Sequence, residues 1–150
     1  MTGSSELHPW PAWLNALREP REIARIWATV DLDRSLAALG RQGERLAQDP
    51  LLGAHVALVR SGSDVPLAVL EPSTEGRMAG WLARSGEGVA GSYVGLGDGM
   101  DEVRRRAAVA GALLSAPADG PFGASVLVLG GAPGAPNLIL VPSQAGTIGR

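Results

Sequence analysis

The stretch that decides the fold is residues 23–40, which read IARIWATVDLDRSLAALG. Its first part, 23–30, is an apolar run of strand length, and the leucines after it recur at helical spacing. Asp31 stands at the junction, where its side chain can accept a hydrogen bond from the first turn of a helix. Gly40 stands where that helix would stop. The stretch therefore predicts a strand followed directly by a helix.

The same pattern returns 66 residues later, counted from Val30 to Leu96. Residues 89–96 (VAGSYVGL) predict a strand, and apolar residues between Met100 and Leu114 fall on one helical stripe. In both halves this pair is followed by two short apolar runs separated by turn residues, which predicts a hairpin. The runs are residues 53–60 and 65–70 in the first half, and 124–129 and 137–141 in the second.

Three further segments are interpreted as follows. Residues 41–48 continue the helical character of the segment before them, and residues 74–84 predict a short helix between the halves. Residues 1–22 form an N-terminal tail and a short helix starting near Pro11, because proline suits the first turn of a helix. Neither half has enough core to stand alone. We therefore expect residues 23–150 to form one α+β domain whose curved mixed sheets enclose a central cavity.

Composition excludes several classes of function. The chain has 150 residues, the size of one domain, and a net charge of −2, which argues against nucleic-acid binding. Without cysteine it can form neither disulfides nor thiolate zinc sites, and without lysine it cannot form a Schiff base. His8 and His55 are its two histidines, too few for a His-rich metal site. Neither a signal peptide nor a membrane span is present, so we expect a cytoplasmic protein.

Four short motifs occur in an order that matches a known family. They are residues 30–33 (VDLD), 69–72 (VLEP), 86–88 (GEG) and 121–123 (PFG). Over residues 23–141 the layout resembles the vicinal oxygen chelate superfamily, which includes glyoxalase I, bleomycin-resistance proteins, methylmalonyl-CoA epimerase and extradiol dioxygenases. The resemblance implies two paired βαβββ modules, about 23–86 and 87–150, around a pocket. It also implies a homodimer.

The positions of the family's metal ligands differ in this chain. Metal-dependent members place a histidine five residues before the valine of the first motif, and Arg25 stands there. The corresponding position in the second half is Gly91, and the usual acidic ligand of the first hairpin falls near Ala68. The last strand, 137–141, has no carboxylate. Arginine cannot be deprotonated to bind a metal, and glycine and alanine have no donor. We therefore expect no metal and no cofactor.

The resemblance also assigns a face of the sheet to the pocket. Alternation along the first strand puts Arg25, Trp27 and Thr29 on one face, which by the resemblance lines the cavity. Trp27 would then stack on a hydrophobic ligand beside Thr29, with Arg25 placed to pair with an anionic oxygen. The alternatives are that Trp27 fills the core and that Arg25 makes a surface ion pair.

The fourth β-strand supplies the matching face of the second half. Gly91, Tyr93 and Gly95 alternate onto it, so the two glycines leave room and Tyr93 offers a ring and a hydroxyl. Together with Ala68 and the first-strand residues they form the expected ligand site. His55 could act as a general base, although a histidine in a strand is often structural. The candidate catalytic set is therefore Arg25, His55 and Tyr93.

Three functions remain open at this stage. The first is a metal-independent enzyme that isomerises, cyclises or dehydrates a hydrophobic, polyketide-like metabolite. The second is a binding protein that sequesters a drug or metabolite in the same pocket without chemistry. The third is a structural or regulatory dimer without a ligand. The polar side chains of Arg25, His55 and Tyr93 favour the enzyme, because they could supply acid–base or electrostatic catalysis.

Overall fold

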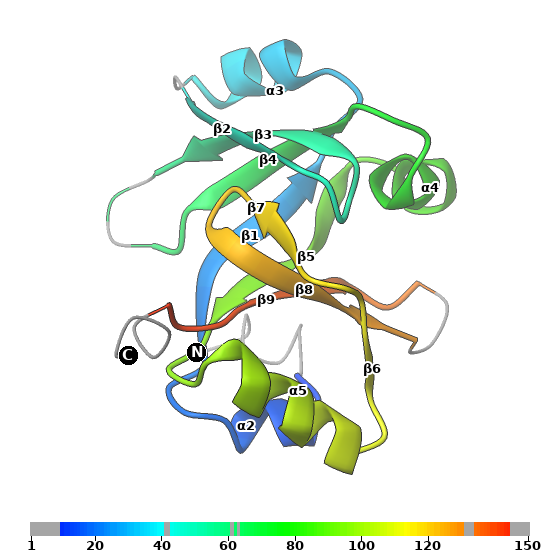
Figure 1. Cartoon of the computed structure of the whole chain (residues 1–150). Helices are drawn as coiled ribbons and strands as arrows, with labels where there is room; N and C mark the ends of the chain where they lie inside the picture. Colours follow the sequence, from blue (N-terminus) through cyan, green and yellow to red (C-terminus); the bar gives the residue numbers. More distant parts are fainter. Residues whose placement is uncertain (1–9, 41–42, 61, 63, 131–133, 145–150) are drawn as a thin grey trace.

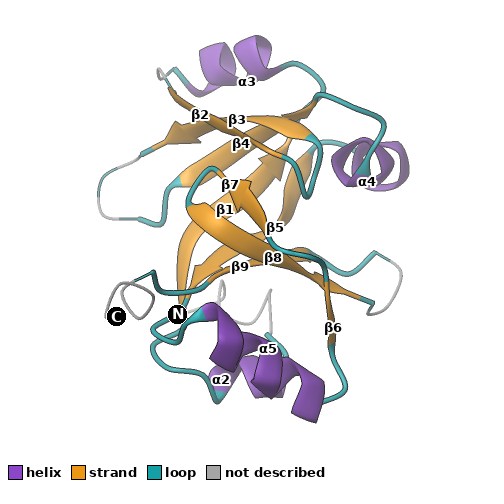
Figure 2. Cartoon of the chain, in the orientation of Figure 1, coloured by secondary structure: helices purple, strands orange, loops and turns teal. Residues whose placement is uncertain are grey.

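The computed structural model describes residues 10–40, 43–60, 62, 64–130 and 134–144. In Figures 1 and 2 a strongly curled sheet runs through the molecule, and its helices lie on the outside. A short helix α2 (Ala12–Asn15) comes first. The first half is β1 (Arg21–Ala28), α3 (Leu32–Leu39), β2 (Glu44–Asp49), β3 (Ala54–Val59) and β4 (Leu67–Pro72). After α4 (Arg77–Ser85), the second half is β5 (Gly88–Gly95), α5 (Met100–Val109), β6 (Leu113–Leu114), β7 (Ala118–Gly120), β8 (Gly123–Leu129) and β9 (Asn137–Val141).

The strand order confirms the predicted α+β fold and its internal repeat. The sheet runs β2-β3-β4-β1-β5-β9-β8-β6, and β7 pairs with β8 beside this path. In the first half β1 pairs parallel to β4, and in the second half β5 pairs parallel to β9. The antiparallel pair β1 and β5 joins the halves. The curl brings β7 into contact with β2, so the two ends of the sheet approach each other (Figure 1).

Both ends of α3 form as the sequence predicts. Asp31 accepts a hydrogen bond from the backbone N–H of Arg34 at 3.1 Å, and Gly40 ends the helix with a left-handed φ of 67°. A side-chain cap of this kind stabilises a helix by about 1 kcal/mol. None of the described helices is long and apolar enough to cross a membrane.

The helical interpretation of residues 41–48 is wrong. Residues 44–49 form the strand β2, which pairs antiparallel with β3 and places Leu46 opposite Val56. Residues 41 and 42 lie outside the described part of the chain. A mostly polar run around one leucine is compatible with a surface helix. Pairing with the neighbouring strand overrides this weak local preference.

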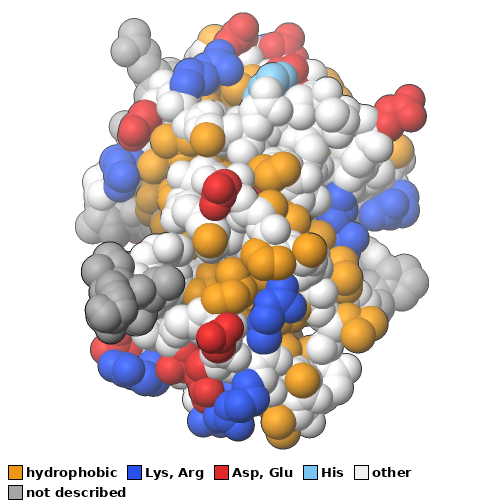
Figure 3. All heavy atoms as spheres, viewed as in Figure 1, with side chains coloured by type: hydrophobic (Ala, Val, Ile, Leu, Met, Phe, Trp, Pro, Cys, Tyr) orange, Lys and Arg blue, Asp and Glu red, His pale blue; other side chains and the backbone are white. Residues whose placement is uncertain are grey.

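The curled sheet has an inner and an outer face with different coverings. The inner face holds the main core cluster, in which β1 contributes Ala24, Ile26 and Ala28, all fully buried. On the outer face, α3 covers the first half, while α2 and α5 cover the second. In Figure 3 acidic and basic side chains are interspersed over the face shown. The face on which a candidate site residue lies therefore decides whether it meets the inner core or the covering helices.

Candidate functional site

Tyr93 lies at the centre of the inner face. It is fully buried on β5, and its ring meets that of Phe122 edge to face with centroids 4.8 Å apart. Its hydroxyl donates a hydrogen bond of 2.6 Å to Asp49 Oδ2. Burial, and then the charge and hydrogen bond of Asp49, raise the pKa of Tyr93 well above its usual range. The phenol is therefore a neutral donor tied to a carboxylate.

Asp49 is the buried carboxylate that receives this bond. It ends β2 and is 1% exposed. Its Oδ1 accepts hydrogen bonds from the backbone N–H groups of Leu51 at 2.8 Å and Leu52 at 3.0 Å. A buried carboxylate is stable only when its oxygens are hydrogen-bonded, and both oxygens of Asp49 are. The Asp49–Tyr93 pair thus links a hairpin of the first half to the second half.

Most of the rest of the inner face is apolar. Buried aliphatic side chains from five strands line it, namely Ala24, Ile26, Ala28, Val56, Leu58, Ala68, Leu70, Leu127 and Ile139. Within the described residues no group of three His, Cys, Asp or Glu converges as a metal site would require. The inner-face oxygens of Tyr93 and Asp49 are bonded to each other. These side chains do not fit a divalent ion, which needs several free O or N ligands.

Open space lies at the end of the inner face, where β1 begins and β5 and β9 end. We call it the Arg21 pocket; its volume is about 380 Å³. Arg21 pairs with Gly95, two residues beyond Tyr93 on the same face of β5. The lining residues are Glu19, Arg21, Ile23, Gly95, Leu96, Gly97, Phe122, Val141, Pro142, Ser143 and Gln144. Phe122 connects this pocket to the buried ring of Tyr93.

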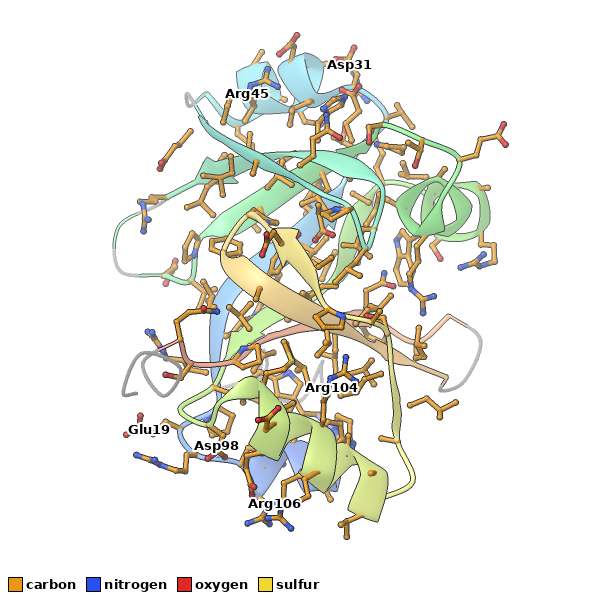
Figure 4. All side chains as sticks on the ribbon, viewed as in Figure 1. Glu19, Asp31, Arg45, Asp98, Arg104 and Arg106 are labelled. Carbon is orange, nitrogen blue, oxygen red and sulfur yellow. The ribbon has the colours of Figure 1, made fainter. Side chains whose placement is uncertain are left out.

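Asp98 holds the rim of the Arg21 pocket in place. Its Oδ2 accepts from the backbone N–H of Arg18 at 2.8 Å, and its carbonyl oxygen accepts from the N–H of Ser143 at 2.9 Å. Arg18 in turn accepts a 2.7 Å bond from the N–H of Gly97. Between these ties Glu19 adopts a left-handed φ of 49°, which costs energy in a residue with a Cβ. Figure 4 shows Glu19 and Asp98 close together beside the start of β1.

The pocket combines one cation and one carboxylate with an apolar floor. A Cβ added to Gly95 would lie 3.0 Å from Ile23 Cδ1 and 3.8 Å from Arg21 Nε, so this glycine leaves space beneath the guanidinium. No ion pair within the described residues engages Arg21. A guanidinium of this kind can bind a carboxylate or an enolate oxygen, and a carboxylate can accept a proton. The pocket therefore suits an apolar molecule carrying a carbonyl or acid group.

The placement of Arg25 and Trp27 on the pocket face is wrong. Both lie on the outer face, where Trp27 packs into the cluster of Ala57, Val59 and Val69 beneath α3. Arg25 pairs with Glu22 at 2.9 Å, and the hydrogen bond to Glu22 is the main cause of its raised pKa. Strand alternation separates two faces but does not say which is inside. The alternatives stated above are therefore the ones that hold: Trp27 packs in a core cluster, and Arg25 makes an ion pair.

Thr29 is buried at the end of β1, away from the Arg21 pocket. Its hydroxyl lies 2.6 Å from Ser35 Oγ and donates to Glu87 Oε2 at 3.0 Å. Glu87 also accepts from the backbone N–H of Val30. These bonds, led by that of Val30, lower the pKa of Glu87. Thr29 thus fixes the turn into α3 and does not line the Arg21 pocket.

His55 is separated from Tyr93 by the sheet. On β3 the neighbours Ala54 and Val56 belong to the inner cluster, so His55 points to the outer face. There it stands opposite Glu71 of β4. The structure therefore does not bring Arg25, His55 and Tyr93 together, because two of them face outward and one faces inward.

The three small residues predicted for the pocket have different surroundings. Ala68 is fully buried within the inner cluster. Gly91 leaves no room, because a Cβ there would overlap the carbonyl oxygen of Asn137, and its φ is 153°. Gly95 does border open space, at the Arg21 pocket. Tyr93 shares their face as predicted, but it does not line that pocket.

The comparisons with known proteins rest on structure. No family model matches the sequence, and no curated protein matches it. A hypothetical protein from Bacillus halodurans superposes with a TM-score of 0.67 at 15% identity, over 85% of this chain and 96% of the other. A Streptomyces coelicolor methylmalonyl-CoA epimerase variant, in complex with 2-nitronate-propionyl-CoA, gives 0.66 at 24% identity, over 85% and 99%. The chain therefore shares the fold of these proteins, which agrees with the fold expected from the resemblance.

A second epimerase with this fold gives a similar match. The methylmalonyl-CoA epimerase of Mycobacterium tuberculosis has a TM-score of 0.66 at 17% identity, over 86% of this chain and 91% of the other. At these identities the likeness establishes the shared fold alone.

Sequence reasoning missed the residues that build this site. Arg21 and Glu19 flank Pro20 just before the predicted first strand, and Asp49 comes directly after the segment 41–48 interpreted as helical. Phe122 belongs to a family motif, but no role was assigned to it. A usable signal was the single phenylalanine two residues before an apolar strand run. For Asp49, the Asp-Pro step before Leu51 was a turn signal.

Proposed function

We propose that this chain is a metal-independent isomerase that moves a proton on a small apolar molecule in the Arg21 pocket. The observation that carries the proposal is the meeting of Glu19 and Arg21 above an apolar floor at the open end of the inner face. Glu19 would remove a proton from a carbon next to a carbonyl and return it, from the same side, to a neighbouring atom of the enolate. Arg21 would stabilise the oxyanion formed in between.

Two further observations support this reading. Neighbours with the same fold include methylmalonyl-CoA epimerases, so the scaffold is one on which isomerases are built. The inner face supports metal independence, because its oxygen-bearing side chains are engaged within the protein: Tyr93 and Asp49 bond to each other, and Asn137 bonds to Arg77 and to the carbonyl oxygen of Ala90. A pocket of about 380 Å³ falls within the usual range for small-molecule sites. A polyketide-like compound with a carbonyl group and an apolar body fits this chemistry.

Hydrogen–deuterium exchange tests the proposal. A panel of apolar β-dicarbonyl compounds and carboxylic acids is screened by thermal shift with EDTA present, and hits are followed by proton NMR in D₂O. We expect enzyme-dependent exchange of a carbon-bound proton that EDTA does not reduce. Glu19→Gln should slow exchange by roughly 100-fold or more while ligand binding persists. Arg21→Gln should both slow exchange and weaken ligand binding.

Glu44→Gln is the matched control, since Glu44 is an exposed carboxylate on the edge strand β2. It should leave exchange unchanged. The proposal fails if Glu19→Gln and Glu44→Gln exchange equally fast, or if EDTA abolishes exchange and a divalent ion restores it.

Sequestration without chemistry is the second candidate, and one observation favours it. His55 and Arg25 lie on the outer face and Tyr93 is sealed against Asp49, so the pocket has few titratable groups. In that case a hit would bind tightly and be recovered unchanged, with no exchange. The homodimer stays a prediction, which sedimentation velocity tests directly.

A further inference from the structure

A second pocket lies at the other end of β9 from the Arg21 pocket. We call it the α4 cleft; it has a volume of about 500 Å³ between α4 and the segments flanking the β8–β9 connection. Asn137, the first residue of β9, lines the cleft, whereas Val141, the last, lines the Arg21 pocket. Four strand steps separate them by roughly 13 Å. In Figure 1 α4 lies on the right and the end of β9 on the left.

The α4 cleft is positively charged. Arg77 and Arg84 line it, and none of the described lining residues is acidic. Elsewhere Arg25, Arg34 and Arg45 each pair with a carboxylate within the molecule, as do Arg105 and Arg106. In the described part of the chain no ion pair engages Arg77 or Arg84. Two cations without carboxylate partners in one concave site favour an anionic ligand.

Arg77 is held in a fixed orientation. Its Nε donates a 2.8 Å hydrogen bond to Asn137 Oδ1, and Asn137 Nδ2 donates a 3.0 Å bond to the carbonyl oxygen of Ala90. Asn137 is 5% exposed, so this chain of bonds anchors the guanidinium to the sheet. Because Nε takes part in the anchor, the two terminal nitrogens stay available for a fork of hydrogen bonds to a phosphate.

Glycines keep the helix side of the cleft bare. Gly76, the N-cap of α4, and Gly80, one turn further on, both line the cleft. A Cβ on Gly80 would come within 3.3 Å of Arg84 Nη1, so the missing side chain lets the Arg84 guanidinium lie against the helix. No side chain caps the N-terminus of α4 at Gly76. The missing side chains therefore leave room for an anion beside the guanidinium groups, while the first turn of the helix is itself bonded, since the N–H of Met78 donates to the carbonyl oxygen of Leu52 at 3.0 Å.

Apolar surface adjoins these charged groups. Trp81, on the next turn of α4, is 8% exposed and lines the cleft together with Val128 of β8. Gly130 and Gly134 border it from the other side. A small molecule with a phosphate at one end and an apolar or flat body at the other would match this division.

We propose that the α4 cleft binds a phosphate-bearing small molecule, with Arg77 and Arg84 holding the phosphate and Trp81 and Val128 contacting its apolar part. This site is separate from the Arg21 pocket and does not depend on the function proposed for that pocket. Binding involves no covalent step.

Calorimetric titration of the full chain with inorganic phosphate and with phenyl phosphate tests the proposal. We expect both to bind saturably, and phenyl phosphate to bind more tightly than inorganic phosphate because its ring contacts Trp81. Arg84→Gln should weaken both by roughly tenfold or more, since a charge-assisted contact is lost. Arg106→Gln removes the same charge at the far end of α5 (Figure 4) and should change affinity less than about twofold.

A second variant separates binding from folding. Gly80→Ala favours the helix and should raise the melting temperature. Its methyl group displaces Arg84, so phenyl phosphate should bind several-fold more weakly although the protein is more stable. The proposal is overturned if Arg106→Gln weakens binding as much as Arg84→Gln, if Gly80→Ala binds like the parent, or if neither probe binds at millimolar concentration.

Discussion

The two faces of β1 have opposite characters. The inner face presents Ala24 and Ile26, which are fully buried and have no polar side-chain atom. The outer face presents Arg25 and Trp27, the residues that look most able to bind a ligand, and both have structural partners there. The difference teaches that in this molecule the polar and aromatic side chains of a strand serve its packing: Trp27 packs beneath a helix and Arg25 forms an ion pair. Ligand-sized space lies instead at the strand ends.

The curl of the sheet explains this division. The inner surface of a curled sheet is the tighter one, and small or aliphatic side chains fill it without strain. A tryptophan fits better on the outer surface, where α3 provides a second layer. At the start of β1 the inner face opens to solvent, and Arg21 can occupy it.

The largest expected loss of stability follows from adding one methyl group at Gly91, on the inner face of β5. Gly91→Ala places a Cβ into the carbonyl of Asn137 and forces alanine into a φ of 153°. We expect a loss of about 3 to 5 kcal/mol in the free energy of unfolding, measured by urea denaturation. Gly111→Ala is the control, because it also has a positive φ, 77°, but no atom within 4 Å of the added Cβ. It should cost only about 1 to 2 kcal/mol. Equal losses would show that backbone strain and not crowding matters at Gly91.

The buried polar pair on the inner face gives the next largest effect. Tyr93→Phe leaves Asp49 Oδ2 without its donor, and we expect a loss of about 1.5 to 3 kcal/mol. In a double-mutant cycle with Asp49→Asn the coupling energy should exceed about 1 kcal/mol. Additive losses would mean that the bond contributes nothing to stability. If Tyr93 were catalytic, Tyr93→Phe would instead lower turnover without lowering the melting temperature.

Alkaline titration isolates the same hydroxyl, because Tyr93 is the single tyrosine in the chain. In the unfolded chain the phenol ionises near pH 10, while burial raises its pKa in the folded protein. The folded state then holds a proton that the unfolded state has lost. Stability should thus be unaffected below pH 10 and should fall by about 1.4 kcal/mol per pH unit above it, until the folded pKa is reached.

Ultraviolet difference spectroscopy of tyrosinate, combined with denaturation at several pH values, measures this effect. Tyr93→Phe should lack this part of the alkaline loss. A tyrosinate signal that appears near pH 10 in the folded protein would show that the hydroxyl is open to solvent.

Substitutions on the outer face should have the smallest effects. Arg25→Gln removes a partly exposed pair with Glu22 and should cost less than about 1 kcal/mol. His55→Gln should leave ligand binding and turnover in the Arg21 pocket unchanged. Thermal shift of both variants with and without a hit compound checks stability and binding, and the exchange assay in D₂O checks turnover. A loss of turnover in His55→Gln, with binding intact, would restore His55 as a catalytic residue.

The sequence predicted the repeat because each half has a strand of apolar residues followed by a capped helix. Asp31 and Gly40 act within a few residues of chain, so local rules located both ends of α3. Residues 44–49 form a strand only through pairing with β3, and a local pattern cannot report such a distant partner.

The candidate site could be predicted only in part, and for the same reason. Alternation correctly put Tyr93 and Gly95 on one face of β5. It did not reveal that Asp49 reaches Tyr93 across 44 positions of sequence, or that Asn137 fills the space beside Gly91. The choice between inner and outer face depends on the direction of curl, which the whole sheet determines.

The location of the ligand can be measured directly by following backbone and indole N–H signals in NMR spectra. The probe is the panel compound that raises the melting temperature most. The structure predicts that the amides of Gly95 and Gly97, which line the Arg21 pocket, shift on titration while the indole signal of Trp27 stays in place. Shifts at Trp27 and His55 with none at Gly95 and Gly97 would place the ligand on the outer face and contradict this site.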